Sequence, residues 1–337
     1  MHPRFVALCV ALSFAWLAPA SAVAERLLSI SPGGGNRPPD ALLRTIDSAN
    51  GSTVPGASVT ITLAGRTVLG GTGLARHPQS GIVYALLKIQ GSSFRRLVEL
   101  DEHTGVATDI GDTGHRFAGI AFASNGTLYA IEGDGGGVPE ALFTLNTSDA
   151  SSALFQQLSA GSDGETIAFD PDDGRLYHGS GIGTPNHVNG EKFEKIDLSS
   201  HAVTNIPLSG FDYEELSALT YSGGGFFAGD VGSAAVDMPR FFRITAQGAV
   251  TLLGNMDHVS KGLVVAAPPP LVPAMPLPMG IALALGLALA ARVNNRARAQ
   301  LRHRDSRLLA VSRANHLRER RSHRPPSRPV HESTLDS

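Results

Sequence analysis

The sequence predicts an all-β fold, a five-bladed β-propeller, and three observations lead to this prediction. The composition is rich in turns, since Gly makes up 38 of 337 residues and charged residues only 17%. Asn125-Gly126 stands between two β-rich runs, and this dipeptide is the strongest short-range signal of a hairpin. Similar hairpins recur along the chain at a regular step.

Four hairpins of this kind start at residues 73, 119, 166 and 218, in steps of 46, 47 and 52 residues. A third and a fourth β-rich run follow each of them. Four antiparallel strands per unit, at this period, are typical of a propeller blade. The expected third and fourth runs are Arg96–Leu100 and Val106–Ile110, Ala141–Leu145 and Ala153–Leu158, Phe193–Ile196 and Val203–Leu208, and Arg240–Ile244 and Val250–Leu253.

The two ends of the repeat region complement each other. Leu27–Ile30, Ala41–Ile46 and Val59–Leu63 look like strands two, three and four of a blade that lacks its first strand. Gly262–Val265 looks like a lone first strand. Joining the two ends closes the first blade with the C-terminal strand and leaves no open edge in the ring. A two-sheet sandwich is the alternative, although it would not explain the regular step.

With these repeats, residues 27–266, within an expected propeller domain at 25–266, resemble exported propeller proteins of the NHL and YncE type. The resemblance is one of architecture. No Trp-Asp dipeptide and no kelch pattern is present, and Trp16 is the only tryptophan. The resemblance therefore implies the fold and names no activity.

Residues 1–24 are expected to be a secretory signal peptide. Arg4 precedes the apolar stretch Phe5–Leu17, and small residues at positions 20–24 offer cleavage sites. A presequence of mitochondrial type or a buried helix is the alternative. Cys9, the one cysteine, lies in this segment. The mature chain would then have no thiol, which excludes disulfides, zinc–thiolate sites and cysteine nucleophiles.

The charge divides between two regions of the chain. Residues 25–270 carry 15 Lys and Arg against 26 Asp and Glu, whereas residues 292–337 carry 12 Arg and 4 acidic residues. The net charges of −11 and +8 indicate different surroundings for the two regions.

A short apolar segment separates these regions. Residues 267–278 form a spacer in which six of twelve residues are proline. The segment from Met279 to Ala291 is apolar, and the basic tail begins at Arg292. With residues 271–278 included, the apolar stretch is long enough to span a bilayer, and the arginines favour a cytoplasmic tail. We therefore expect one C-terminal transmembrane helix with its core at 279–291.

The order of spacer, proline motif, apolar helix and basic cluster resembles the C-terminal sorting signals of the PEP-CTERM and IPTL-CTERM type. Val272, Pro273, Pro276 and Pro278 carry this likeness. It implies that a sorting protease processes the protein for surface display. The chain departs from the pattern because it lacks Pro-Glu-Pro and continues far beyond the helix. A plain membrane anchor is the alternative.

The tail at 292–337 is expected to be disordered and to contact anionic lipid headgroups rather than nucleic acid. It is rich in arginine but has no aromatic residue on which bases could stack. An over-extended reading frame is a further alternative for this segment.

No standard catalytic motif is present: the chain has no GxSxG, Walker loop, HExxH or CxxC. The acidic segment Asp170–Gly174 lacks the spacing of an EF-hand loop. We interpret it as a turn between two strands, where Asp, Pro and Gly are favoured for backbone reasons. Whether the chain is an enzyme stays open, with a non-catalytic role favoured.

The candidate ligand or metal residues come from propeller geometry. Loops before each first strand and after each second strand should open on one face, near the channel. Carboxylates gathered there would suit Ca²⁺ or another hard cation. The shared feature of the candidates is an acidic or imidazole side chain in such a loop: Glu132, Asp134, Asp163, Glu165, Glu215, Asp230 and His258.

Together these features predict an exported, non-catalytic binding or structural protein at the bacterial cell envelope or surface, with release into the medium as a second outcome. It would be a monomer that takes an envelope or extracellular ligand on its loops. The alternative function is a calcium-dependent hydrolase of lactonase-like type that uses the loop carboxylates as bases.

Overall fold

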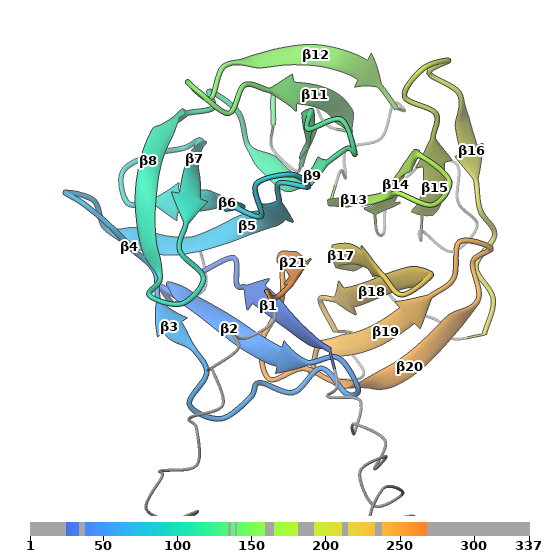
Figure 1. Ribbon diagram of the computed structural model, residues 1–337, viewed down its shortest axis with the longest axis horizontal. Helices are drawn as coiled ribbons and strands as arrows, with labels where there is room; N and C mark the ends of the chain where they lie inside the picture. Colours follow the sequence, from blue (N-terminus) through green and yellow to red (C-terminus); the bar gives the residue numbers. More distant parts are fainter. Residues whose placement is uncertain are drawn as a thin grey trace, which may run out of the picture. The chain divides into compact units, whose positions relative to one another are not determined.

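The computed structural model describes residues 25–33, 38–133, 136–138, 140–158, 165–180, 192–210, 215–232 and 238–267. In these ranges the backbone forms strands and turns, and no helix long and apolar enough to cross a membrane is found among them. Five separate sheets surround one axis (Figure 1), which confirms the all-β, five-bladed arrangement. The expected signal peptide, sorting-like motif (272–278), membrane helix (279–291) and basic tail lie outside the described residues.

Blades 1 and 2 are built from the first half of the chain and its last strand. From the axis outward, blade 1 has the order β21, β1, β2, β3, and blade 2 the order β5, β6, β7, β8, β4. The bounds are β1 Arg26–Ile30, β2 Leu42–Asp47, β3 Val59–Thr60, β4 Thr62–Leu63, β5 Val68–Arg76, β6 Val83–Ile89, β7 Arg95–Leu100, β8 Val106–Asp112 and β21 Gly262–Val265.

Blades 3, 4 and 5 each consist of four consecutive strands that run from the axis to the rim. The bounds in blade 3 are β9 Phe117–Phe122, β10 Leu128–Glu132, β11 Ala141–Leu145 and β12 Ser152–Gln157; in blade 4, β13 Thr166–Asp170, β14 Arg175–Ser180, β15 Lys192–Ile196 and β16 Val203–Asn205; in blade 5, β17 Leu216–Ser222, β18 Gly225–Asp230, β19 Arg240–Ile244 and β20 Val250–Asn255.

The hydrophobic core lies in the five seams between neighbouring blades. Each of the five core clusters combines side chains of two adjacent blades. In the seam between blades 4 and 5, for example, Tyr177 and Phe193 pack against Phe226. Because every blade buries both of its faces, its strands are apolar on both sides. Each blade therefore needs its two neighbours in the closed ring of five to cover them.

Blade 1 is closed by strands from opposite ends of the propeller. β21 pairs antiparallel with β1, with Leu27 opposite Val265 and Ile30 opposite Gly262. β21 also lies between the inner strands β5 and β17 (Figure 1). The expected closure by the C-terminal strand is therefore confirmed.

An ion pair holds the end of the closing strand. Arg76 donates to the Val265 carbonyl from Nη2 at 2.9 Å and forms an ion pair with Glu102 at 2.8 Å. Glu102 in turn accepts a hydrogen bond from the Ala267 backbone N at 3.0 Å. Hydrogen bonds from Arg76 and Ala267 outweigh the burial of Glu102 and lower the pKa of its carboxyl group. The two side chains thus fix the backbone from 265 to 267.

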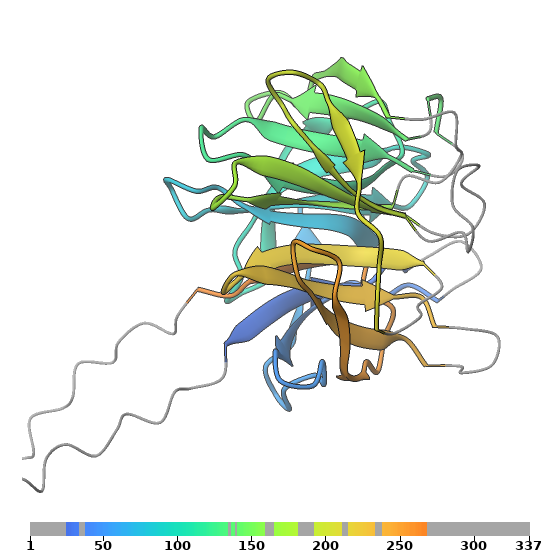
Figure 2. The same cartoon turned by 90° about the vertical axis from the view of Figure 1, so that its right-hand side faces the viewer.

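The ring has two different faces. We call the side on which the inner strands begin the loop face, and the side on which they end the exit face. The chain enters and leaves the propeller on the exit face, where the Ala266 N donates to the Arg26 carbonyl at 2.9 Å. Figure 2 shows both ends of the propeller on the same side.

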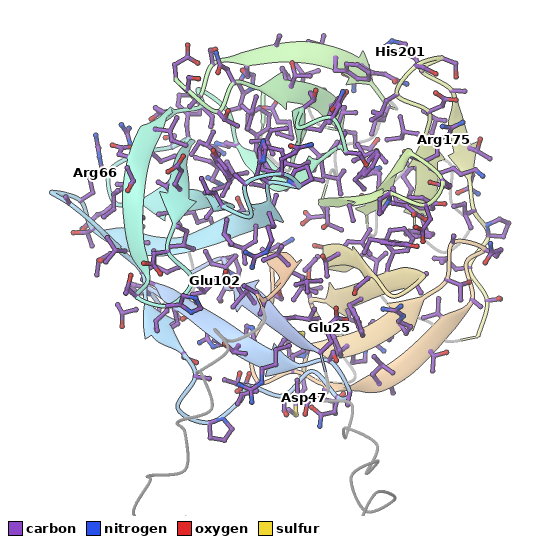
Figure 3. All side chains as sticks on the ribbon, viewed as in Figure 1. Glu25, Asp47, Arg66, Glu102, Arg175 and His201 are labelled. Carbon is purple, nitrogen blue, oxygen red and sulfur yellow. The ribbon has the colours of Figure 1, made fainter. Side chains whose placement is uncertain are left out.

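The segment expected as one strand at 59–63 divides between two blades. β3 pairs with β2, but β4 joins the rim of blade 2 as a parallel neighbour of β8, with Thr62 opposite Val106. The turn after β4 carries Arg66, which lies on the rim (Figure 3) near Asp109 of β8 at 3.5 Å. The segment therefore links blades 1 and 2 at their outer edges.

We expect Leu263→Ala in β21 to lower the free energy of unfolding by about 2–5 kcal/mol, because it opens a cavity in the seam that the closing strand completes. Leu154→Ala is the matched control, since Leu154 is 58% exposed on β12 and its loss should cost at most about 0.5 kcal/mol. Urea unfolding followed by circular dichroism measures both. Equal, small effects would show that β21 is outside the cooperative unit.

Candidate functional site

Five of the seven candidate site residues are described, and all five lie on the loop face: Glu132, Glu165, Glu215, Asp230 and His258. Asp134 and Asp163 lie outside the described residues. The five do not form one cluster: Glu165 and Glu215 share Lys261 as a partner, and Glu132, Asp230 and His258 are each held in a separate set of hydrogen bonds. Within the described ranges no three His, Cys, Asp or Glu side chains are grouped so that they could hold a metal ion. The calcium site stays a prediction.

Glu165, Glu215 and Lys261 form a charged clasp at the mouth of the channel. Each directly precedes the inner strand of its blade, in blades 4, 5 and 1. Lys261 Nζ forms ion pairs with Glu165 and, at 3.2 Å, with Glu215 Oε1. Burial disfavours the ammonium, whose side chain is 15% exposed, but the two carboxylates outweigh this and raise the pKa of Lys261. The clasp joins three blades and carries a net charge of −1.

Hydroxyl groups connect neighbouring inner strands beside the clasp. Thr72 Oγ1 donates to the Phe117 carbonyl at 2.7 Å, and Ser217 Oγ donates to the Ser260 carbonyl at 2.7 Å. Both residues sit at register shifts in their strands, where a β-bulge turns the extra residue out of the ladder. The mouth of the channel is therefore polar, and its inner strands are bonded directly to one another.

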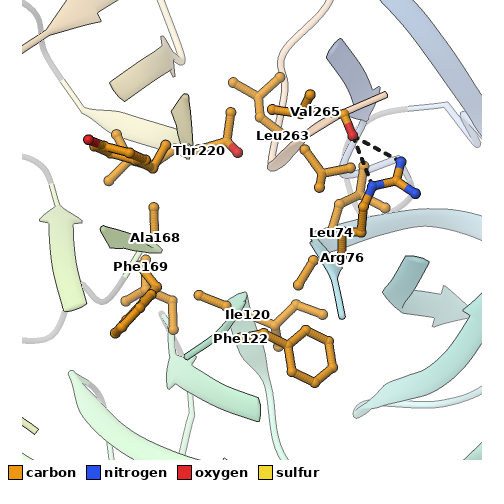
Figure 4. Close-up of a pocket in the computed structure, with 15 residues that line it drawn as sticks. Leu74, Arg76, Ile120, Phe122, Ala168, Phe169, Thr220, Leu263 and Val265 are labelled. Carbon is orange, nitrogen blue, oxygen red and sulfur yellow. Dashed lines mark hydrogen bonds between the residues drawn. The ribbon is translucent and has the colours of Figure 1, made fainter. Parts of the chain in front are cut away.

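Below the mouth the channel is aliphatic. One buried side chain from each inner strand contributes to this level: Leu74, Ile120, Ile167, Leu219 and Leu263. Together with the two residues that follow each of them, they line an axial cavity of about 180 Å³ (Figure 4). Along the axis, the polar mouth of the channel is therefore followed by a layer of apolar side chains.

Glu132 and Asp230 end the second strands of blades 3 and 5 and hold the loops that follow. Glu132 accepts hydrogen bonds from His115 Nδ1 at 3.0 Å and from the backbone N of Gly137 and Val138. These bonds outweigh the burial of Glu132 and lower its pKa. A side chain at Gly136 would meet Glu132 Cγ at 2.3 Å, so the loop requires glycine there.

Asp230 makes the corresponding contacts in blade 5. It accepts from the Arg240 backbone N at 2.7 Å, from Arg240 Nε at 2.7 Å and from the Gly232 backbone N at 3.0 Å. Both carboxylates are buried. Their geometry is that of groups that fix loop backbone through charge-assisted hydrogen bonds.

His258 belongs to a network that joins β1 to the segment before β21. Its Nε2 lies 2.7 Å from Ser29 Oγ and its Nδ1 lies 2.7 Å from Asp257 Oδ1. This order of serine, histidine and aspartate resembles a catalytic triad, in which the histidine activates the serine as a nucleophile. Ser29, however, is 0% exposed in the middle of blade 1 and also bonds to Ser260. No substrate can reach it, so the network stabilises the closure of the ring.

The acidic turn lies on the exit face, and its interpretation as a turn is confirmed. Residues 171–174 connect β13 to β14, and Gly174 has a φ of 71°. Asp170 Oδ1 accepts from the Asp172 backbone N at 2.8 Å, and Tyr177 donates its hydroxyl to Asp173 Oδ2 at 2.8 Å. Burial, together with the neighbouring Asp173 charge, raises the pKa of Asp170.

Sequence reasoning missed Lys261, Arg240 and Ser29. Acidic and imidazole side chains are typical metal ligands. A pattern of such ligands therefore does not include the basic side chains of Lys261 and Arg240 or the hydroxyl of Ser29. Lys261 could have been found from the repeat, because it precedes its inner strand as Glu165 and Glu215 precede theirs.

We expect Lys261→Met to lower the free energy of unfolding by about 3 kcal/mol at pH 7, because the buried Glu165 and the partly buried Glu215 then face each other without a cation. Lys195→Met is the control, since Lys195 lies on β15 away from the clasp, and should cost less than about 1 kcal/mol. Urea unfolding measures both variants, and a loss no larger than that of Lys195→Met would contradict the assignment of the clasp.

Burial lowers the pKa of His258 below its ordinary value of 6.5, and the hydrogen bond that its ring donates to Asp257 offsets this only in part. The unfolded chain therefore binds the proton more readily, and stability should fall as the pH drops below about 6.5. His258→Gln should reduce the difference in urea midpoint between pH 7.5 and pH 5.5. His103→Gln, in an exposed turn, should keep the parent's pH dependence; the same dependence in the His258 variant would refute the prediction.

The comparisons with known proteins do not indicate a function for this chain. No protein-family model matches the chain, and no curated protein matches it. A chain in a nidogen/laminin complex is 12% identical with a TM-score of 0.43, and the match covers 73% of this chain and 99% of that one.

Two further solved structures are similar at the same level. TolB from Acinetobacter baumannii is 13% identical with a TM-score of 0.45, covering 68% of this chain and 53% of TolB. Kuenenia stuttgartiensis hydrazine synthase is 14% identical with a TM-score of 0.35, covering 63% and 59%. These scores carry no functional argument, so the propeller assignment rests on the strand pairing of the chain itself.

Proposed function

We propose that this chain is an exported, non-catalytic binding protein of the bacterial cell envelope that takes its partner on the loop face. One observation carries the proposal: the propeller is entered and left side by side on the exit face. The apolar segment 279–291, if it anchors the chain, is thus joined through the spacer to the exit face. The loop face is then the surface free to meet a partner.

The state of the loop-face carboxylates favours binding over hydrolysis. Glu132 and Asp230 hold loop backbone, while Glu165 and Glu215 are paired with Lys261. A general base needs a lone pair directed at substrate, whereas these groups are directed at the protein. The net charge of −11 in residues 25–270 favours a basic partner, because charge complementarity speeds encounter and selects partners.

The signal-like segment 1–24 and the sorting-like motif at Val272–Pro278 support export and display. They remain proposals of the sequence. A calcium-dependent hydrolase is the alternative, and it requires added Ca²⁺ to raise the melting temperature of the protein, by binding the folded state.

A single-cysteine experiment tests both export and the binding face, since the mature chain has no cysteine of its own. Val138→Cys places a thiol on the loop face and Ile82→Cys places one on the exit face, and both parent side chains are 39% exposed. On intact cells of the source bacterium, a membrane-impermeant maleimide should label both. A maleimide photo-crosslinker should capture a partner from Val138→Cys alone.

The outcomes separate the two parts of the proposal. Failure of both thiols to react on intact cells, with reaction after lysis, would overturn export. Capture from Ile82→Cys in place of Val138→Cys would overturn the loop face as the binding surface.

A further inference from the structure

The seam between blades 3 and 4 differs from three of the other seams at one position of the sheet. At one cross-strand position of strands two and three, blades 2, 3 and 5 carry apolar pairs: Ala85 with Val98, Ala130 with Phe143, and Ala228 with Phe242. Blade 1 carries Ser29 with Arg44 at this position, and blade 4 carries His178 with Glu194. Leu176 and Ile196, on the same side of these strands, pack in the cluster shared with blade 3. His178 and Glu194 therefore face blade 3.

A second polar pair follows toward the loop face. Ser180 stands opposite Lys192 in the next position on the same side of the sheet. Lys192 Nζ donates to Glu140 Oε1 of blade 3 at 3.0 Å, and His178 Nδ1 lies 3.1 Å from Glu194 Oε1. All five side chains are buried, with at most 6% exposed. The loop-face end of this seam is thus a closed polar patch across two blades.

This patch is costly for the fold. Apolar pairs fill the same position in three other blades, while buried charged groups lose their hydration. Glu140 has a φ of 57°, a left-handed backbone that a residue with a side chain adopts under strain. The strained backbone of Glu140 and the buried charged groups occur at one place. Their combination indicates a polar binding site, which an apolar seam could not provide.

Among the described residues, three polar atoms of the patch have no hydrogen-bond partner: His178 Nε2, Ser180 Oγ and Glu140 Oε2. In the neutral imidazole whose Nδ1–H donates a hydrogen bond to Glu194, Nε2 can only accept. Glu140 Oε2 also accepts, and the Ser180 hydroxyl can donate. A small molecule that donates two hydrogen bonds and accepts at least one would therefore satisfy all three atoms.

We propose that this patch, the His178 seam site, binds water. A water molecule donates twice and accepts twice, and buried waters make about three hydrogen bonds to groups of this kind. A metal ion fits less well, because the Lys192 ammonium is part of the patch and the described residues offer no group of three metal ligands. The inference is independent of the partner proposed for the loop face.

Nuclear magnetic resonance on the purified full-length chain, labelled with ¹⁵N-histidine, tests the site. The long-range ¹H–¹⁵N spectrum should show His178 with an unprotonated, hydrogen-bonded Nε2. A nuclear Overhauser effect from the His178 ring to a long-lived water should accompany it. His178→Gln assigns the signal. His201→Gln, on the rim, is the matched control and should leave the water contact intact.

His178→Ala with Glu194→Phe places the blade 5 pair in blade 4 and should abolish the water contact while the chain stays folded. If this variant fails to fold, Ser180→Ala should weaken the contact, because it removes one of the three partners. A protonated Nε2, no contact with long-lived water, or a crystal structure in which the three atoms bond only to protein would overturn the inference.

Discussion

The pairing of β1 with β21 is the constraint on which the rest of the propeller depends. Each blade covers its apolar faces only with two neighbours, so a break anywhere exposes two seams. The break would fall at blade 1, whose inner strand comes from the other end of the chain. Two polar networks lie at this junction: Arg76 with Glu102 on the exit face, and Ser29 with His258 inside the blade. Closure is thus reinforced by directional bonds as well as by burial.

The sequence predicted the architecture well because propeller blades repeat. Turn residues such as Asn125-Gly126 and the alternation of apolar runs are local signals, and they located all five blades and the closing strand. Boundaries were less accurate. β5 begins at Val68, ahead of the expected start at Gly73, and residues 59–63 divide between two sheets. Which strand residues 62–63 join depends on the neighbouring blade, and local sequence does not contain that information.

The loop-face residues show the same limit more sharply. Their position on one face follows from strand order and was predictable. Their chemical state was not, because Glu165 meets Lys261 and Glu140 meets Lys192 only when separate blades come together. Carboxylates that the sequence suggests as ligands for a metal or partner mostly form hydrogen bonds and ion pairs that hold blades and loops in place. The departure at His178 and Glu194 became visible only after the registers aligned the blades pair by pair.

The closing strand also imposes an order in time. β1 is made first and β21 last, and β1 cannot complete its sheet until residue 265 has been made. Contacts between such distant residues form late, because closing the long loop between them costs entropy before the contacts can stabilise the chain. The blade at the beginning of the sequence is therefore the last to be finished. In the export that we propose, the chain would cross the membrane before it has a finished ring to unfold.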